Sequence, residues 1–120
     1  MYEIKLFDSE LRIMEILWRE GNISAKQISM IAKEEIGWNK NTTYTVIKKL
    51  IDKNAVKREE PGFICSPLIS QDAVQKEETE RLIDKLWGGS KKAFFAAFVG
   101  EHLSKDEISE LKSLIEKRWP

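Results

Sequence analysis

The chain has 120 residues, of which 42% are hydrophobic and 33% are charged, and its formal net charge at pH 7 is zero. This composition is typical of a soluble globular protein rather than a disordered one, and the length suits a small domain with an oligomerising extension. Charges interrupt every apolar run, so no membrane-spanning helix is expected. Residues Met1 to Lys5 lack the basic and apolar regions of a signal peptide. We therefore expect a cytoplasmic protein.

The basic residues are unevenly distributed along the chain. The segment from Trp38 to Arg58 contains six Lys or Arg residues and one acidic residue, Asp52, which gives it a local net charge of +5. Acidic residues concentrate between Asp72 and Asp84. Phosphate binding depends on local clusters of cations more than on total charge, so the basic segment is a candidate for nucleic-acid binding. A solvated helix face would explain the same charges.

Two helices are predicted at the start of the chain. The first runs from Ser9 to Glu20, because apolar residues recur there at helical spacing and Asp8 is a good N-cap. A short extended step at Ile23 follows. Ser24 then caps a second helix over about Ala25 to Glu35.

A third helix and a β-hairpin are predicted next. The helix runs from about Asn41 to Lys53, and Asn54 is one of the few residue types that tolerate the left-handed conformation after a helix. Two short strands, Val56 to Glu59 and Phe63 to Ser66, are joined by Glu60-Pro61-Gly62, a turn sequence. The expected buried stripe of the helix consists of Thr43, Val46, Ile47, Leu50 and Ile51.

This order of three helices and a hairpin is that of a winged helix, in which the second and third helices form a helix-turn-helix. The same elements could also build a protein-interaction module without an operator, and the pattern alone leaves both open. We expect a mainly α protein in which residues 1–69 form a winged-helix DNA-binding domain.

The second half of the chain is predicted to be helical. A long charged helix covers about Gln71 to Trp87, and Gly88-Gly89 breaks it. A very apolar helix follows from Lys92 to Val99. The last helix starts at Ser104, where Ser104 and Glu107 fit a capping box.

Residues 70–120 are expected to form a helical dimerisation region. Three helices of this size hold too little mass to bury their aromatic side chains within one chain, and a homodimer with interlocked helices solves the problem. Two-fold DNA sites also call for two-fold proteins. Packing of the helices on the N-terminal module is the alternative. The expected interface residues are Leu82, Leu86, Trp87, Phe94, Phe95, Phe98, Leu111, Leu114 and Ile115.

The third helix is the expected recognition helix, because the second helix of a helix-turn-helix enters the major groove. Asn can pair with adenine, Lys with guanine, and Thr methyl groups can contact thymine. Asn41 and Thr42 could instead only cap the helix, and Tyr44 could be a packing residue. The DNA-binding candidates on this helix are Lys40, Asn41, Thr42, Tyr44, Thr45, Lys48 and Lys49.

Phosphate contacts are expected from Lys48 and Lys49, and from Ser24 and Lys26 at the start of the second helix. The wing adds Lys57 and Arg58 as candidates. We expect it to contribute little affinity, because Glu59 and Glu60 lie at its tip and phosphates would repel them.

No enzymatic constellation is evident. His102 is the only histidine and has no cysteine partner, and there is no Gly-rich phosphate loop. Cys65 is the only cysteine, so neither an internal disulfide nor a Cys-based metal motif is possible, and a buried small residue is expected there. We expect neither a metal nor a cofactor.

The chain resembles, essentially from end to end, the BlaI/MecI repressors of penicillinase and methicillin-resistance genes, which are relatives of the copper-responsive repressor CopY. The segments that carry the resemblance are Ser9-Glu10-Leu11, Ile16-Leu17-Trp18, Trp38 with Thr42, Thr45 and Lys49, Leu50 to Lys53, Ser66-Pro67, Gly88-Gly89, Ala97-Phe98-Val99 and Leu103 to Ile108. Their order and spacing together are specific, although each one alone is only moderately so.

The resemblance implies a winged helix, a helical dimerisation region and binding to palindromic operators upstream of resistance genes. It also implies a membrane sensor protease that relieves repression by cutting the repressor between an Asn and a Phe in the apolar helix. The matching pair here is Ala97-Phe98, in which the Asn is absent. Cleavage at this bond is therefore a hypothesis.

Two further departures from the family pattern affect the expected specificity and signal. Lys40-Asn41 precede Thr42 where the family often has Pro then Lys, so the operator sequence can differ. The C-terminal Cys cluster of the copper-responsive branch is absent, which excludes copper sensing through such a cluster. A regulator that responds to another signal is the alternative function.

Overall fold

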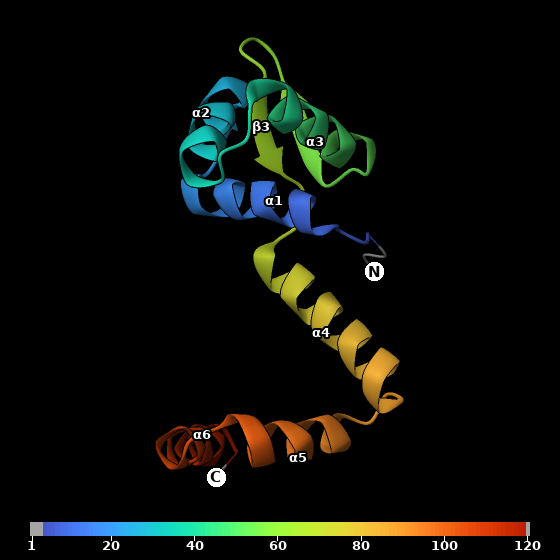
Figure 1. Cartoon of the computed structure of the whole chain (residues 1–120), viewed down its shortest axis with the longest axis vertical. Coiled ribbons are helices and arrows are strands. Elements are labelled where there is room, and N and C mark those ends of the chain that lie inside the picture. The colour runs from blue at the N-terminus through green and yellow to red at the C-terminus, as the bar shows by residue number, and fades with distance from the viewer. Residues whose placement is uncertain (1–3, 120) are drawn as a thin grey trace. The chain divides into compact units, whose positions relative to one another are not determined.

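The computed structural model describes residues 4–119, which form six helices and a three-stranded sheet (Figure 1). The chain divides into two compact units, Met1–Glu77 and Glu78–Pro120. Helix α4 (Gln71–Trp87) belongs to both, because the division falls within it.

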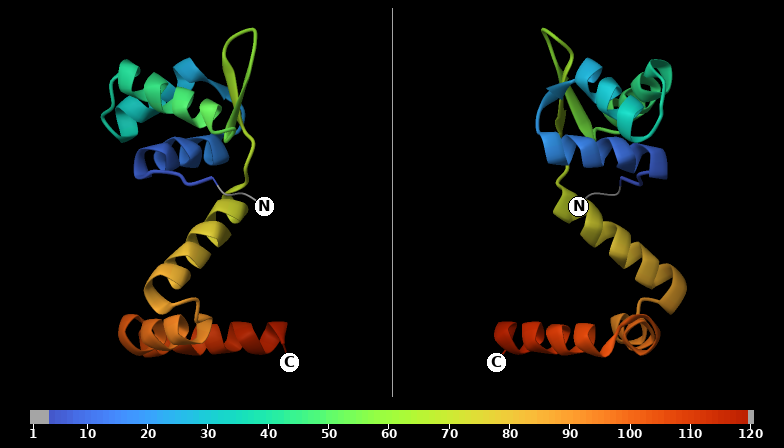
Figure 2. Two further views of the ribbon diagram at one scale, coloured as in Figure 1. Left: turned by 90° about the vertical axis from the view of Figure 1, so that its right-hand side faces the viewer. Right: turned by 60° about the vertical axis from the view of Figure 1, so that its left-hand side comes forward.

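The first unit is a winged helix, as predicted. Its helices are α1 (Asp8–Glu20), α2 (Ala25–Glu35) and α3 (Lys40–Asp52), and its hairpin consists of β2 (Val56–Glu59) and β3 (Ile64–Pro67). The hairpin lies alongside the three helices (Figure 2). The core that joins them is formed mainly by Leu6, Ile13, Met14, Ile16, Leu17, Ala25, Ile28, Ala32, Val46, Ile47, Leu50, Ala55, Val56, Cys65 and Ile69.

The sheet has a third strand that the sequence did not predict as part of a sheet. Strand β1 (Ile23–Ser24) pairs with β3 in an antiparallel register, Ile23 with Cys65 and Ser24 with Ile64, and the strand order is β1-β3-β2. Two residues are too short to show an alternating pattern, and their partner strand lies forty residues further along the chain. The extended step at Ile23 was therefore predictable, but its pairing was not.

Two predicted helix starts are off by one residue, because the caps differ from those expected. Helix α1 begins at Asp8, and Phe7, not Asp8, occupies its N-cap position. The backbone N–H of Phe7 donates to Oε1 of Glu10 at 2.8 Å, which satisfies a donor at the helix start. Helix α3 begins at Lys40, because Asn39 accepts a hydrogen bond from the backbone N–H of Thr42 at 2.8 Å.

The end of α3 and the turn of the hairpin have the expected backbone conformations. Asn54 has φ 61° and Gly62 has φ 96°, both in the left-handed region. Phe63 is also left-handed, with φ 50°. A bulky residue seldom adopts this conformation, so β3 begins at Ile64 instead of Phe63.

The first unit continues into α4 through a direct tie to α1. The indole Nε1 of Trp18 donates to the carbonyl of Ile69 at 3.0 Å, and Val74 packs against the core. Ser70 accepts a hydrogen bond from the backbone N–H of Ala73 at 3.0 Å at the start of α4.

The second unit contains the end of α4 with α5 (Lys91–His102) and α6 (Lys105–Arg118). Ser90 caps the start of α5, and the helix is longer at both ends than the predicted segment of Lys92 to Val99. The capping box of Ser104 and Glu107 at the start of α6 is confirmed. Ile83 is the only buried residue among those described in this unit.

Candidate DNA-binding surface

Helix α3 has a sharp division between a buried and an exposed side. Thr43, Val46, Ile47 and Leu50 are buried in the core. These positions recur at three- and four-residue spacing, so the intervening side chains must point outward. The exposed residues are Lys40, Asn41, Thr42, Thr45, Lys48 and Lys49, with the acidic Asp52 at the end of the helix.

The start of α3 is capped by Asn39, a role that the sequence analysis had left open for Asn41 and Thr42. Both of those side chains are exposed in the first turn of the helix. The hydroxyl of Thr45 donates to the carbonyl of Asn41 at 2.8 Å. What Thr45 can offer to a base edge is therefore its methyl group and the remaining acceptor capacity of its oxygen.

Tyr44 packs between α3 and the wing. Its ring meets the ring of Phe63 edge-on, with centroids 5.9 Å apart, and Nζ of Lys40 lies 5.6 Å from the centroid of the Tyr44 ring. Tyr44 is half-buried. Of the two roles considered for Tyr44, this geometry favours packing.

The start of α2 is a closed capping box. The backbone N–H of Gln27 donates to Oγ of Ser24 at 3.1 Å, and the N–H of Ser24 donates to Oε1 of Gln27 at 3.0 Å. The N–H of Ala25 donates to the carbonyl of Phe63 at 2.9 Å. Lys26 is exposed in this first turn, and its side chain is free of the capping box.

The wing combines the two expected cations with two carboxylates. Lys57 lies 3.7 Å from Glu59, and Nε of Arg58 donates to Glu60 at 2.5 Å. The guanidinium of Arg58 also lies 3.6 Å above the centroid of the Phe63 ring. The hydrogen bond from Arg58 lowers the pKa of the Glu60 carboxyl, so Glu60 stays ionised.

Cys65 and His102, the one cysteine and the one histidine of the sequence, both have ordinary structural positions. Cys65 is buried in β3, and burial raises the pKa of its thiol to about 11. His102 is the last residue of α5, exposed, with its ring 5.4 Å from the ring of Phe98. Among residues 4–119 no group of three or more His, Cys, Asp or Glu residues could hold a metal ion.

Sequence reasoning missed an ion pair that ties the end of α3 to the start of α1. Nζ of Lys53 lies 2.6 Å from Oε1 of Glu10, whose side chain is 1% exposed, and it also donates to the carbonyl of Lys5 at 2.9 Å. It lies 4.5 Å from the centroid of the Phe7 ring. A glutamate within the apolar spacing of α1 was the available signal, but its partner lies 43 residues away.

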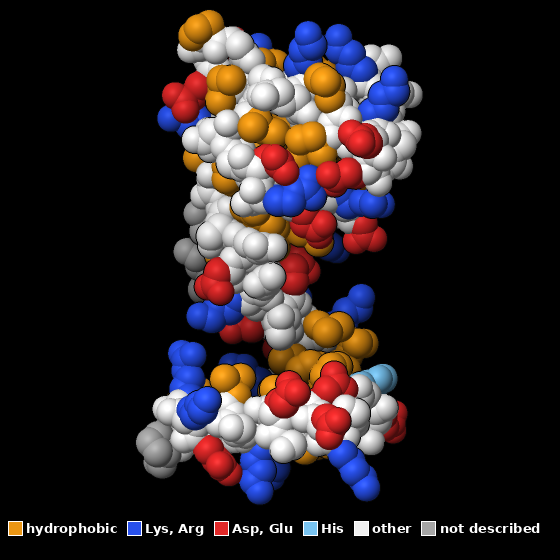
Figure 3. All heavy atoms as spheres, turned by 90° about the vertical axis from the view of Figure 1, so that its left-hand side faces the viewer, with side chains coloured by type: hydrophobic (Ala, Val, Ile, Leu, Met, Phe, Trp, Pro, Cys, Tyr) orange, Lys and Arg blue, Asp and Glu red, His pale blue; other side chains and the backbone are white. Residues whose placement is uncertain are grey.

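The second unit leaves most of its apolar side chains exposed. Trp87, Phe94 and Leu111 are half-buried, and rings of Trp87 and Phe94 meet edge-on at 5.0 Å. In Figure 3 apolar side chains gather beside the single histidine, His102. The exposed large apolar residues of this unit are Leu82, Leu86, Phe95, Phe98, Ile108, Leu114, Ile115 and Trp119.

Helices α5 and α6 enclose an apolar groove within this unit. It is lined by Phe95, Val99, Leu103, Ile108, Leu111 and Ile115, with Lys112 and Glu116 at its edge. Ala97 is exposed within α5. None of the helices formed by residues 4–119 combines the length and the apolar character needed to cross a membrane.

Solved structures with a similar fold include two of a repressor. One is the DNA-binding domain of the repressor BlaI, with a TM-score of 0.54 and 26% identity over 59% of this chain and 90% of that chain. Another is the monomeric form of Bacillus licheniformis BlaI in complex with the blaP half-operator, with a TM-score of 0.53. Its 23% identity over 59% of this chain and 89% of that chain supports the fold only. The fold and the exposed side of α3 together define a winged-helix DNA-binding protein.

The family is shown by a match over nearly the whole chain. The profile of the penicillinase repressor family matches residues 6–117. The methicillin resistance regulatory protein MecI of Staphylococcus aureus strain N315 is 28% identical over 120 residues, covering 98% of this chain and 96% of MecI. The penicillinase repressor of Staphylococcus aureus is 26% identical over 116 residues, covering 94% and 92%. The chain belongs to the penicillinase repressor family, a family of DNA-binding repressors and not of enzymes.

Proposed function

We propose that the protein is a sequence-specific transcriptional repressor that binds palindromic operators as a homodimer. The observation that carries this proposal is the exposed side of α3. Six neutral polar or basic side chains and one carboxylate, that of Asp52, face solvent there, while the opposite side is buried in the core. Because such a protein acts on chromosomal DNA, we place it in the cytoplasm. The operators of antibiotic-resistance genes of the β-lactamase type are the proposed targets.

Residues 1–69 are proposed as the DNA-binding domain. Asn41, Thr42 and Thr45 lie in the first half of α3, which is the part of a recognition helix that reaches base edges. Lys48 and Lys49 are assigned to phosphates, since they follow further along the helix and carry charge without a fixed hydrogen-bonding pattern. Lys40 and Lys26 extend the basic surface. The role assigned to Ser24 is to cap the start of α2.

Replacing Thr45 by Ala tests whether α3 reads bases. The substitution removes the methyl and hydroxyl groups and leaves an exposed helical position that Ala suits well, so the fold should keep its stability. We expect affinity for the preferred duplex to fall on the order of tenfold, with no change for scrambled DNA. Fluorescence anisotropy titrations on both duplexes measure the two affinities.

Lys48→Ala is the matched comparison on the same helix. A lost phosphate contact weakens binding to both duplexes alike and reduces the slope of log K against log salt by about 1. If Thr45→Ala also weakened both duplexes equally, Thr45 would not be a base-reading residue.

Residues 70–120 are proposed as the dimerisation region. Helix α5 has apolar residues on all sides, and among its described residues none is buried. A helix of this kind is stable in water only when other chains or elements cover it, and the apolar groove beside it is bordered by Leu111 and Ile115 of α6. A second copy of the chain, with its own α5 and α6, supplies a matching apolar surface.

Relief of repression by a membrane sensor protease that cuts Ala97-Phe98 is a further part of the proposal. The exposure of both side chains on α5 supports access to this bond. The bond lies inside a helix, so the helix must unwind locally to present an extended segment to a protease. Mass spectrometry of the protein from cells treated with a β-lactam should show a fragment that ends at Ala97. A chain that stays intact in induced cells would favour a different signal.

A further inference from the structure

The wing carries two cations, Lys57 and Arg58, followed directly by two carboxylates, Glu59 and Glu60. Side chains two residues apart lie on the same side of a strand, so each cation has a carboxylate neighbour on its own side. The structure shows both pairs, Lys57 with Glu59 at 3.7 Å and Arg58 with Glu60 at 2.5 Å. The two cations that sequence reasoning assigned to DNA are therefore matched, one for one, by carboxylates of the wing itself.

The pair of Arg58 and Glu60 is held by more than charge. The backbone N–H of Phe63 donates to Oε1 of Glu60 at 3.1 Å, and the Arg58 guanidinium stacks on the Phe63 ring. Phe63 is itself fixed by the ring of Tyr44 and by the N–H of Ala25. Contacts from α2, α3 and the turn thus hold Arg58 and Glu60 in one arrangement.

We propose that Glu59 and Glu60 limit the DNA affinity of this protein by neutralising Lys57 and Arg58. The four charges of the wing sum to zero within about one Debye length, ~10 Å at 0.1 M salt, so the wing as a whole does not attract phosphate. If Arg58 moved to a phosphate, it would leave Glu60 unpaired beside the same phosphate. The basic side chains of α2 and α3 then supply the electrostatic attraction. This inference rests on the DNA-binding function proposed above.

Protection of a sheet edge is another role that the charges of the wing could have. In the strand order β1-β3-β2, β2 lies at an edge, and edge charges discourage pairing with a second chain. That role predicts an effect of the carboxylates on self-association. The proposed role predicts an effect on DNA binding by a protein that does not aggregate.

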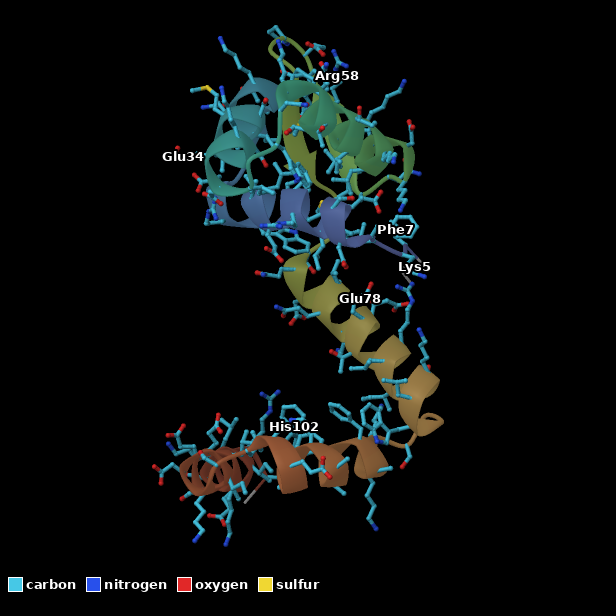
Figure 4. The ribbon with its side chains drawn as sticks, in the orientation of Figure 1. Lys5, Phe7, Glu34, Arg58, Glu78 and His102 are labelled. Atoms are coloured by element: carbon cyan, nitrogen blue, oxygen red, sulfur yellow. The ribbon has the colours of Figure 1, made fainter. Side chains whose placement is uncertain are left out.

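The double variant Glu59→Gln with Glu60→Gln tests the proposal. Gln retains an oxygen that accepts from the N–H of Phe63, so the turn can keep its hydrogen bond. The control is Glu20→Gln with Glu35→Gln, which makes the same change in net charge by removing the two carboxylates that pair with Arg19. Arg58 lies on the hairpin, whereas Glu34, the neighbour of Glu35, lies at the far end of α2 (Figure 4).

We expect the wing variant to bind preferred and scrambled duplexes about tenfold more tightly than the unmodified protein, because phosphate contacts carry no sequence information. The slope of log K against log salt should steepen by up to about 2 per protomer, at ~0.9 for each freed cation. The control should leave the slope unchanged. Anisotropy titrations at several salt concentrations give both quantities.

Unchanged or weaker binding by the wing variant would overturn the proposal, since the carboxylates would then be neutral or helpful to DNA binding. If the double variant aggregates, the single variant Glu59→Gln tests the proposal, because Glu59 takes no part in the hydrogen bond to Phe63. For this variant the slope of log K against log salt should steepen by about 1. The proposed function is tested separately, by whether the unmodified protein prefers one duplex over scrambled DNA. That result does not depend on how the variants compare with the unmodified protein.

Discussion

Phe98→Asp should convert the protein into monomers that bind operator DNA about 10²- to 10⁴-fold more weakly. Phe98 is exposed on α5, where its ring stacks with Phe94 at 5.8 Å. In the proposed dimer this side chain is covered by the second copy, and a carboxylate there would lose its water without gaining a partner. Loss of the dimer removes the gain from binding two half-sites at once, which accounts for the size of the effect.

Sedimentation analysis and DNA titration of the same sample measure this result. Ser109→Asp is the matched control, since it adds the same charge at an exposed position of α6, on the side of that helix opposite Leu111. The control should remain a dimer with full affinity. A Phe98→Asp protein that sediments as a dimer would contradict the placement of Phe98 in the interface.

Lys53→Met should lower the free energy of unfolding by about 3 kcal/mol, because it leaves the buried carboxylate of Glu10 without its cation. Oε2 of Glu10 is buried and has no hydrogen-bond partner, so Lys53 and the N–H of Phe7 are the groups that compensate its burial at Oε1. The exposed fraction of Lys53, 30%, places the effect at the low end for a buried pair. The midpoint of thermal unfolding should fall by more than ~10 °C.

Lys49→Met, an exposed position on the same helix, is the control and should change stability by less than ~0.5 kcal/mol. Adding Glu10→Gln to Lys53→Met should restore part of the loss, because the buried charge is gone and Gln can still accept from Phe7. Equal unfolding midpoints for the Lys53 and Lys49 variants would show that the ion pair does not stabilise the fold.

The fold was largely predictable from the sequence because its elements have local signals. Helical apolar spacing defined α1, α2 and α4, and Ser104 with Glu107 defined the start of α6. The features that the sequence did not predict depend on contacts between distant residues, or on competition between neighbouring residues for a capping position. Strand β1 exists through its pairing with β3, and Asn39 took the cap position at α3 although Asn41 and Thr42 were also suitable residue types.

The candidate site also has features that local sequence patterns predict and features that depend on contacts between distant residues. Which residues of α3 face outward follows from helical periodicity, so the exposed candidates could be named in advance. The packing of Tyr44 against Phe63 could not, since it depends on the position of the wing and on the left-handed backbone of Phe63. The acidic tip of the wing was visible in the sequence, whereas the pairing of each cation with its own carboxylate required the structure.

Selection of bound sequences from a random duplex pool, followed by titration of the winner, tests the central claim most directly. The account predicts an enriched inverted repeat that one dimer occupies, with half-sites one or more helical turns apart and a steep dependence on salt. No enriched sequence, with weak binding and a shallow salt dependence on every duplex, would contradict an operator-binding repressor and point to a protein partner for α3.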